Sequence, residues 1–182
     1  MILIGTAGPA GSGKDTVADY LVEMHGFTKM AFAGPLKAMM AAAGMAEPAD
    51  RAMKEQPIPG FDFTWREAAQ KLGTEWGRGL DPEIWTKIVR RKLESLAGLK
   101  YRTRIVLTDI RFENEAQVVR ELGGQVWHML NRSADLGVNA GHISEGGVMY
   151  RPHEDELIDN SGSLDQLYEQ VETYLAALLE GK

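Results

Sequence analysis

The sequence predicts a three-layer α/β fold, in which a five-stranded parallel sheet carries helices on both faces. Short apolar runs of strand length alternate with longer segments whose apolar residues recur every three or four positions. The first apolar run leads directly into a glycine-rich turn and then into a helix-like segment. Of the 182 residues, 44% are hydrophobic, which is enough for one sizeable core, so we expect a single domain over residues 1–182.

Five segments are predicted to be buried strands because they are short and rich in β-branched or other apolar residues. They are residues 2–6, 28–32, 105–109, 125–130 and 156–159. The segments between them have helical periodicity, which is clearest near the end of the chain. There the apolar positions are Leu164, Leu167, Val171, Leu175 and Leu178. Strands that alternate with helices in this way predict a parallel sheet covered on both faces.

A helical insertion is predicted between the second and third strands, at about residues 35–99. Two helix starts are recognisable in it, because Thr64 precedes WREAAQKL and Asp81 precedes PEIWTKIVRRKL, with proline at the first helical position. After the fourth strand, residues 131–152 contain several glycines and no clear periodicity. This segment is longer than an ordinary connection, so we interpret it as a candidate lid.

Charge and cysteine content limit the classes of function. The formal net charge of −6 argues against a protein that holds polymeric nucleic acid, which needs a basic face, but a local pocket for a mononucleotide remains compatible. The absence of cysteine excludes disulfides and thiolate metal sites and fits a reducing compartment such as the cytoplasm. The apolar start of the chain is far shorter than a membrane span, so no membrane association is expected.

The strongest motif is the glycine-rich turn after the first strand, which reads GPAGSGKDT from Gly8 to Thr16. Strand, glycine loop, lysine and helix follow in the order that a P-loop requires. Glycines allow successive backbone N–H groups to point inward, and the helix N-terminus adds positive potential, so the loop predicts a phosphate site. The predicted triphosphate-binding residues are Gly11, Ser12, Gly13, Lys14, Asp15 and Thr16, with Lys14 reaching the outer phosphates.

Asp15 departs from the usual P-loop pattern, in which serine or threonine follows the lysine. A carboxylate beside phosphates needs a metal ion, an arginine or a donor on the acceptor to offset its charge. We therefore expect Asp15 to hold Mg²⁺ through water or to accept a hydrogen bond from the acceptor. The alternative is a structural role as a favourable charge at the helix N-terminus.

A second polar cluster follows the third strand, at the sheet edge where open α/β sheets bind ligands. Asp109 could orient magnesium-bound water or an acceptor hydroxyl, and Arg111 could fork onto a phosphate. Glu115, one helical turn further on, could pair with Arg111 or meet the acceptor. An acidic cap with a surface ion pair is the structural alternative.

Candidates for an acceptor pocket lie in and before the helical insertion. Lys37 in the segment FAGPLK suits a monophosphate, and Arg66 and Gln70 share a helix face, where they could grip phosphate and read a base edge. Trp85 could stack on a base. Each of these residue types, taken singly, is more often an ordinary surface or core residue.

The remaining candidates flank the fourth and fifth strands. Arg132 could bring positive charge to the transferred group, and Arg151 lies near the end of the candidate lid. His142, Ser144 and Glu145 are scattered through the lid, and we do not expect His142 to act as a base. The turn formed by residues 161–163 could pass close to an adenine ring, or it could simply cap the last helix.

Taken in order along the chain, these segments resemble the bacteriophage deoxynucleoside monophosphate kinase family, a branch of the P-loop nucleoside monophosphate kinases. The resemblance spans nearly the whole chain. It is carried by SGKDT (residues 12–16), AGPLK (33–37), QKLGT (70–74), Trp85, the spacing of Asp109, Arg111 and Glu115, HISE (142–145) and DNSGSL (159–164).

The resemblance implies the P-loop kinase fold with a helical acceptor-binding insertion, and phosphorylation of deoxynucleoside monophosphates by ATP with Mg²⁺. It assigns Lys14 and Asp15 to the phosphate site. It assigns the acceptor site to Arg66, Gln70, Trp85, Asp109, Arg111 and Glu115. The helical insertion here is short, so base preference and dimer contacts are not carried over from larger members, and a homodimer stays open.

Two alternatives stay open at this point. One is a kinase for another small phosphorylated acceptor, such as dephospho-coenzyme A or phosphomevalonate, since the SGKDT loop and the final NSGSL turn would also serve it. The other is a P-loop ATPase or nucleotide switch. A switch usually keeps the P-loop hydroxyl on Mg²⁺, and Asp15 stands in its place here.

Overall fold

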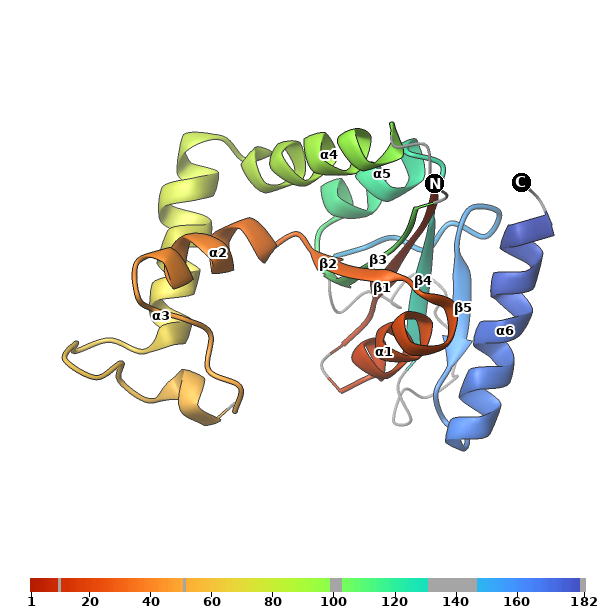
Figure 1. The fold of residues 1–182 in the computed structure, drawn as a ribbon, viewed down its shortest axis with the longest axis horizontal. Helices are drawn as coiled ribbons and strands as arrows, with labels where there is room; N and C mark the ends of the chain where they lie inside the picture. Colours follow the sequence, from red (N-terminus) through yellow and green to blue (C-terminus); the bar gives the residue numbers. More distant parts are fainter. Residues whose placement is uncertain (10, 51, 99–102, 131–146, 181–182) are drawn as a thin grey trace. The chain divides into compact units, whose positions relative to one another are not determined.

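The protein has a five-stranded, entirely parallel sheet, as the sequence predicts (Figure 1). This computed structural model describes residues 1–9, 11–50, 52–98, 103–130 and 147–180, and only the backbone of Asp109. The strands are β1 (Ile2–Ala7), β2 (Thr28–Ala31), β3 (Arg104–Ile110), β4 (Gln125–Leu130) and β5 (Glu156–Asp159), in the order β2-β3-β1-β4-β5. All six residues of β1 are buried, as is typical of the central strand of a parallel sheet.

The chain divides into two compact units. The first unit contains Met1–Ala31 and Leu96–Lys182, and the second contains Phe32–Ser95. The second unit begins and ends within a few residues of the predicted helical insertion at about 35–99. The whole sheet belongs to the first unit, which therefore carries the phosphate loop and the polar cluster after β3.

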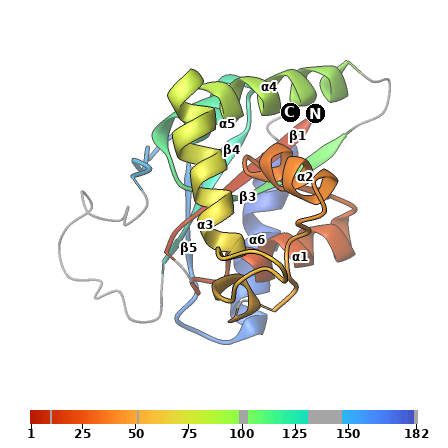
Figure 2. The same ribbon diagram turned by 90° about the vertical axis from the view of Figure 1, so that its left-hand side faces the viewer.

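Helices cover both faces of the sheet in the first unit (Figures 1 and 2). Helices α1 (Lys14–His25) and α6 (Leu164–Glu180) pack together on one face, where their apolar residues share a core with Ile4. The neighbouring residue Gly5 points to the other face, because side chains alternate along a strand. A Cβ atom at Gly5 would lie 3.2 Å from Val119 of α5 (Glu113–Glu121), so α5 covers that second face.

The second unit is helical, apart from an isolated antiparallel bridge between Pro57 and Thr64. Its elements are α2 (Gly34–Ala42), the 3₁₀ turn η1 (Ala52–Glu55), α3 (Trp65–Gln70), the π-helix η2 (Lys71–Arg78) and α4 (Ile84–Ala97), which runs past the end of the unit. Its buried core consists of Leu36, Met40, Trp65 and Trp85.

One of the two predicted helix starts is confirmed, and the other is displaced. The Thr64 hydroxyl accepts a hydrogen bond from Glu67 N at 3.1 Å, and Glu67 Oε2 accepts one from Thr64 N at 2.7 Å, which forms a capping box. Asp81 Oδ1 accepts from Glu83 N at 2.9 Å, but α4 begins only at Ile84. The prediction of proline at the first helical position was therefore wrong, because Pro82 lies in the capping turn.

Candidate functional site

The glycine loop connects β1 to α1 and curls as a phosphate cradle requires. Gly8 and Gly13 have φ angles of +142° and +97°, which residues with a side chain rarely adopt. At Gly8 there is also no room for a side chain, since a Cβ atom would lie 2.8 Å from the carbonyl oxygen of Met129. The loop closes through a hydrogen bond from Ser12 N to Pro9 O at 3.3 Å, and α1 begins at Lys14.

The side chain of Lys14 folds back onto the glycine loop. Its Nζ atom donates hydrogen bonds to the carbonyl oxygens of Gly8 at 2.7 Å and Pro9 at 2.6 Å, and the residue is only 8% exposed. The positive charge is thus held against the loop, beside the N-terminus of α1. Both groups favour a bound anion at this place.

Two buried hydroxyl groups have no hydrogen-bond partner among the described residues: Ser12 Oγ in the loop and Thr6 Oγ1 near the end of β1. Buried polar atoms are nearly always paired, so an orphaned hydroxyl at a loop of this kind suits a ligand. Ser12 Oγ faces Gly8 across the loop, because a Cβ atom at Gly8 would come within 3.0 Å of it.

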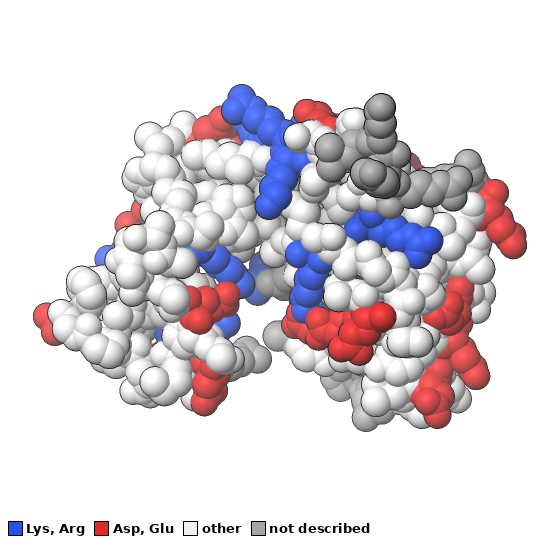
Figure 3. All heavy atoms as spheres, in the orientation of Figure 1, with Lys and Arg blue, Asp and Glu red and all other residues white. Residues whose placement is uncertain are grey.

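Asp15 has a partner that the sequence analysis did not identify, namely Lys29 of β2. Lys29 Nζ lies 3.0 Å from Asp15 Oδ1 and 2.8 Å from Asp19 Oδ1. Burial lowers the pKa of Lys29, but hydrogen bonds with Asp19 and Asp15 outweigh it and raise the pKa overall, so Lys29 stays charged. Figure 3 shows acidic and basic side chains side by side next to α1. No local motif points to Lys29.

The phosphate loop and the polar cluster after β3 lie at one edge of the sheet. Strands β1 and β3 are parallel neighbours, and their register pairs Ala7 with Ile110, so Gly8 and Arg111 leave adjacent strands side by side. Between the pairs Gly5–Leu107 and Ala7–Ile110, β3 has one residue more than β1, which is a β-bulge at Thr108–Asp109. Bulges of this kind are common next to active sites.

Glu115 binds the backbone of the turn that carries Arg111. Its Oε2 atom accepts hydrogen bonds from the backbone N–H of Arg111 at 2.9 Å and of Phe112 at 3.3 Å, and the residue is 5% exposed. The carboxylate thus satisfies donors at the start of α5 and fixes the turn that carries Arg111. This contact is the acidic cap that the sequence predicts as the structural alternative at Glu115.

The turn after β5 contacts the phosphate loop directly. Asn160 Nδ2 donates to Ser12 O at 2.9 Å, and a Cβ atom at Gly13 would lie 2.5 Å from the same nitrogen. The close approach gives Gly13 a second reason to lack a side chain. Ser163 and Gln166 cap α6 reciprocally, with Ser163 N 2.9 Å from Gln166 Oε1, so the capping interpretation of this turn is confirmed.

The predicted acceptor residues of the second unit are described within that unit alone. Lys37 Nζ pairs with Glu47 Oε2 at 2.8 Å, and Arg66 Nε pairs with Glu55. Gln70 is exposed at the end of α3. Trp85 is 5% exposed and donates its indole N–H to Gly73 O at 2.9 Å, so its contacts here are those of a core residue.

The remaining predicted residues fall partly outside the described part of the chain. Four of them lie outside the described residues, as does most of the candidate lid: Arg132, His142, Ser144 and Glu145. Arg151 is described, and its Nη2 atom contacts Glu113 Oε1 at 2.9 Å. Among the described residues, no helix is both long enough and apolar enough to span a membrane.

A family model and two curated relatives that match this chain carry the same description. A family model described as deoxynucleotide monophosphate kinase matches residues 61–171. A protein of Acanthamoeba polyphaga mimivirus assigned as a deoxynucleotide monophosphate kinase is 30% identical over 184 residues, which cover 94% of each chain. The deoxynucleotide monophosphate kinase of Escherichia phage RB69 is 31% identical over 123 residues, 66% of this chain and 49% of the phage protein.

Two solved structures are also similar in outline. A gluconokinase from Sinorhizobium meliloti 1021 has a TM-score of 0.45 and 13% identity, with coverage of 98% of this chain and 93% of that one. TT1252 from Thermus thermophilus has a TM-score of 0.46 and 22% identity, with 97% coverage of both. The family model covers more than half of the chain, and the mimivirus relative nearly all of it. This chain therefore belongs to the deoxynucleotide monophosphate kinase family.

Proposed function

We propose that the protein transfers the γ-phosphoryl group of ATP to a deoxynucleoside monophosphate. In this reaction a phosphate oxygen of the acceptor attacks the γ-phosphorus and ADP leaves. The observation that carries the proposal is the register of β1 against β3, which brings the Lys14 loop and the Arg111 turn to one sheet edge. Phosphoryl transfer depends mainly on positioning and on neutralising charge, and cationic groups at one edge can supply both.

On the donor side, the backbone of Gly11–Thr16 would cradle the phosphates and Lys14 would turn from its carbonyl partners toward the outer phosphates. The residues around the glycine loop fit a Mg²⁺ ion that binds together with the nucleotide. The described residues form no cluster of three or more His, Cys, Asp or Glu side chains, and Mg²⁺ is usually held by one or two carboxylates together with substrate phosphates. Asp15 would bind the ion through water, and the ion would neutralise charge on the phosphates.

On the acceptor side, Arg111 would bind the acceptor phosphate and Asp109 would orient it. Arg111 lies in an exposed turn whose backbone Glu115 holds in place. Lys37, Arg66 and Gln70 remain candidates for acceptor phosphate and base, each on an α-helix of the second unit. Trp85 is buried and would need to expose its ring to stack on a base. We therefore assign it a structural role in the core of the second unit.

A mononucleotide acceptor suits the charge of the protein better than a polymer does. Acidic side chains gather over α1 and α6 in Figure 3, and the formal net charge is −6. A polyanion would meet repulsion on such a surface, whereas a mononucleotide needs only a local basic site. The lack of cysteine supports a cytoplasmic location, which would be the host cytoplasm for a viral protein.

An acceptor panel tests this proposal. The protein is incubated with ATP and Mg²⁺ together with each deoxynucleoside monophosphate, each ribonucleoside monophosphate, dephospho-coenzyme A or phosphomevalonate, and ADP release is measured. We expect ADP release to depend on one or more deoxynucleoside monophosphates. Release that is equal with and without every acceptor would identify an ATPase or switch, and release with only a non-nucleotide acceptor would identify a different kinase.

Arg111→Ala is expected to raise the KM for the acceptor roughly 10- to 100-fold, the range that a lost charged hydrogen bond of about 1.5 to 3 kcal/mol produces. The KM for ATP should change by no more than about twofold, which corresponds to about 0.5 kcal/mol. Arg111→Lys is the matched control, because it keeps the charge and loses the planar guanidinium group. Its acceptor KM should lie between those of the wild type and Arg111→Ala. Equal acceptor KM values in all three proteins would contradict the role.

A further inference from the structure

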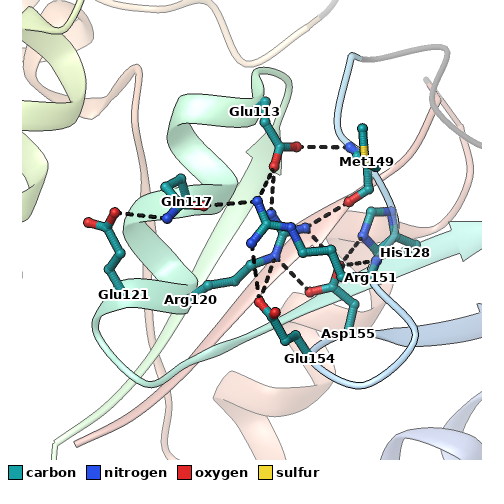
Figure 4. Close-up of polar contacts among 9 residues, drawn as sticks. All are labelled: Glu113, Gln117, Arg120, Glu121, His128, Met149, Arg151, Glu154 and Asp155. Carbon is teal, nitrogen blue, oxygen red and sulfur yellow. Dashed lines mark hydrogen bonds and ion pairs between the residues drawn. The ribbon is translucent and has the colours of Figure 1, made fainter.

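A charge cluster with a buried centre lies on the side of the sheet that α5 covers (Figure 4). We call it the Asp155 cluster, and it comprises Glu113, Arg120, His128, Arg151 and Asp155. Asp155 is its centre. Its carboxylate accepts hydrogen bonds from Arg120 Nε at 3.0 Å, Arg120 Nη2 at 2.7 Å, the backbone N–H of Arg151 at 2.9 Å and His128 Nε2 at 3.1 Å.

The centre of the cluster is shielded from solvent and stays charged. The side chain of Asp155 is 0% exposed, and that of Arg120 is 4% exposed. A buried ion pair is maintained only where good geometry and further hydrogen bonds offset the loss of hydration. The two-pronged contact between Arg120 and Asp155 meets this condition, and so the centre is a rigid part of the first unit.

Glu113 connects this rigid centre to the turn that carries Arg111. It is the first residue of α5, two positions after Arg111. Its Oε1 atom accepts from Arg120 Nη1 at 2.8 Å and from Arg151 Nη2 at 2.9 Å. Its Oε2 atom accepts from the backbone N–H of Met149 at 2.9 Å. One carboxylate thus joins α5, Arg120 and the segment around Met149.

The segment from Gly147 to Met149 lies against the Arg111 turn. A Cβ atom at Gly147 would be 3.5 Å from the carbonyl oxygen of Arg111, and Val148 is 1% exposed. Arg120 Nη2 also donates to Met149 O at 2.8 Å, so the cluster holds this segment by both its N–H and its C=O groups. Glu115 holds the turn from the α5 side, through its backbone N–H groups.

We propose that Glu113 is a positioning residue for the acceptor phosphate, because it fastens the Gly147–Met149 segment across the Arg111 turn and so fixes where the Arg111 side chain starts. This inference rests on the proposed function for its kinetic consequence. Its structural consequence, a rigid Arg111 backbone, holds without any substrate. A site held in place before binding needs less reorganisation during the reaction.

Glu113→Gln tests the proposal, because it keeps the size of the side chain and removes the charge that three donors share. The acceptor KM should rise roughly three- to tenfold, a typical coupling within one hydrogen-bond network, while the KM for ATP stays unchanged. Glu154→Gln is the matched control. Glu154 is half exposed and contacts Arg151 Nη1 at 3.3 Å, and its distance to Arg120 Nε is 4.0 Å. In the described part of the chain, Met149 N donates to Glu113 and not to Glu154, so loss of the Glu154 charge should leave both KM values unchanged.

A double-mutant cycle separates positioning from general loosening of the fold. If Glu113 acts through Arg111, then Glu113→Gln should have no further effect on the acceptor KM in an Arg111→Ala background. If the fold-increases in acceptor KM of the two single substitutions simply multiply in the double variant, the proposal is wrong. An equal rise in the KM values for ATP and for the acceptor would also overturn it.

Hydrogen–deuterium exchange of the substrate-free protein tests the structural part by itself. Glu113→Gln should speed exchange of the Arg111 and Phe112 amides, whereas Glu154→Gln should not. Unchanged exchange at these amides would overturn the inference even if the acceptor panel succeeds. If the panel fails but exchange accelerates, the proposed function is wrong and the role of Glu113 in fixing the turn stands.

Discussion

Lys14→Ala is expected to lower kcat roughly 10²- to 10³-fold, the effect of removing one preorganised donor from a transition state that gains charge. In the structure the ammonium group lies 2.7 Å and 2.6 Å from two loop carbonyl oxygens and is nearly buried. These contacts hold the ammonium group at the loop, from which it would turn toward the outer phosphates. Initial rates at saturating ATP and acceptor, measured by coupled ADP detection, give the comparison.

The same substitution removes two hydrogen bonds within the loop, so its effect on folding is measured separately. Thermal unfolding of Lys14→Ala should stay close to that of the wild type, because the loop keeps its Ser12–Pro9 bond and its contact with Asn160. Lys87→Ala serves as a control, since Lys87 is an exposed lysine on α4. A folded Lys14→Ala protein with wild-type kcat would contradict the assignment of the loop.

Asp155→Asn is expected to reduce the free energy of unfolding by about 3 to 5 kcal/mol, because it leaves the buried guanidinium of Arg120 without its main partner. The side chain of Arg120 has almost no access to water that could replace the lost carboxylate. Urea unfolding at pH 7 measures the change. Glu154→Gln, which removes an exposed carboxylate from the rim of the cluster, should cost less than about 1 kcal/mol.

This difference in stability should depend on pH in one direction. Burial alone would raise the pKa of Asp155, but hydrogen bonds from His128, Arg120 and the backbone of Arg151 outweigh it and lower the pKa to about 2. Because the pKa is lower than the value of about 3.9 in an unfolded chain, ionised Asp155 stabilises the fold above that value. The contribution is lost as the pH falls toward 2. The gap between wild type and Asp155→Asn should therefore narrow from pH 4 to pH 2, and a constant gap would contradict the assignment.

Much of the fold is predictable from local sequence because its signals are local. All five predicted strands agree with the structure to within one residue at each end, and β4 and β5 agree at both ends, since each strand is a short apolar run between polar turns. The capping box at Thr64 and Glu67 was foreseeable for the same reason. The π-helix Lys71–Arg78 was not foreseeable from the local sequence. A Cβ atom at Gly77 would lie 2.5 Å from Trp85 Cζ2, and this packing comes from residues further along the chain.

The candidate site divides in the same way. The phosphate loop is contiguous in sequence, so its geometry could be predicted from Gly8 to Thr16. The contact from Asn160 to Ser12 spans 148 positions, and the bridge from Lys29 to Asp15 joins two different elements. A single sequence gives no signal for such pairs. The capping role of Glu115 was foreseen only as an alternative, because spacing in the sequence is equally compatible with a side-chain pair with Arg111.

Binding of ATP with Mg²⁺ to the wild-type protein tests the central claim most directly. Titration calorimetry with a non-hydrolysable ATP analogue and Mg²⁺ should give saturable binding at one site, with a Kd between roughly 1 μM and 1 mM. Lys14→Ala should weaken that binding. No saturable binding by correctly folded wild-type protein over this range would contradict the assignment of the glycine loop as the site for the triphosphate.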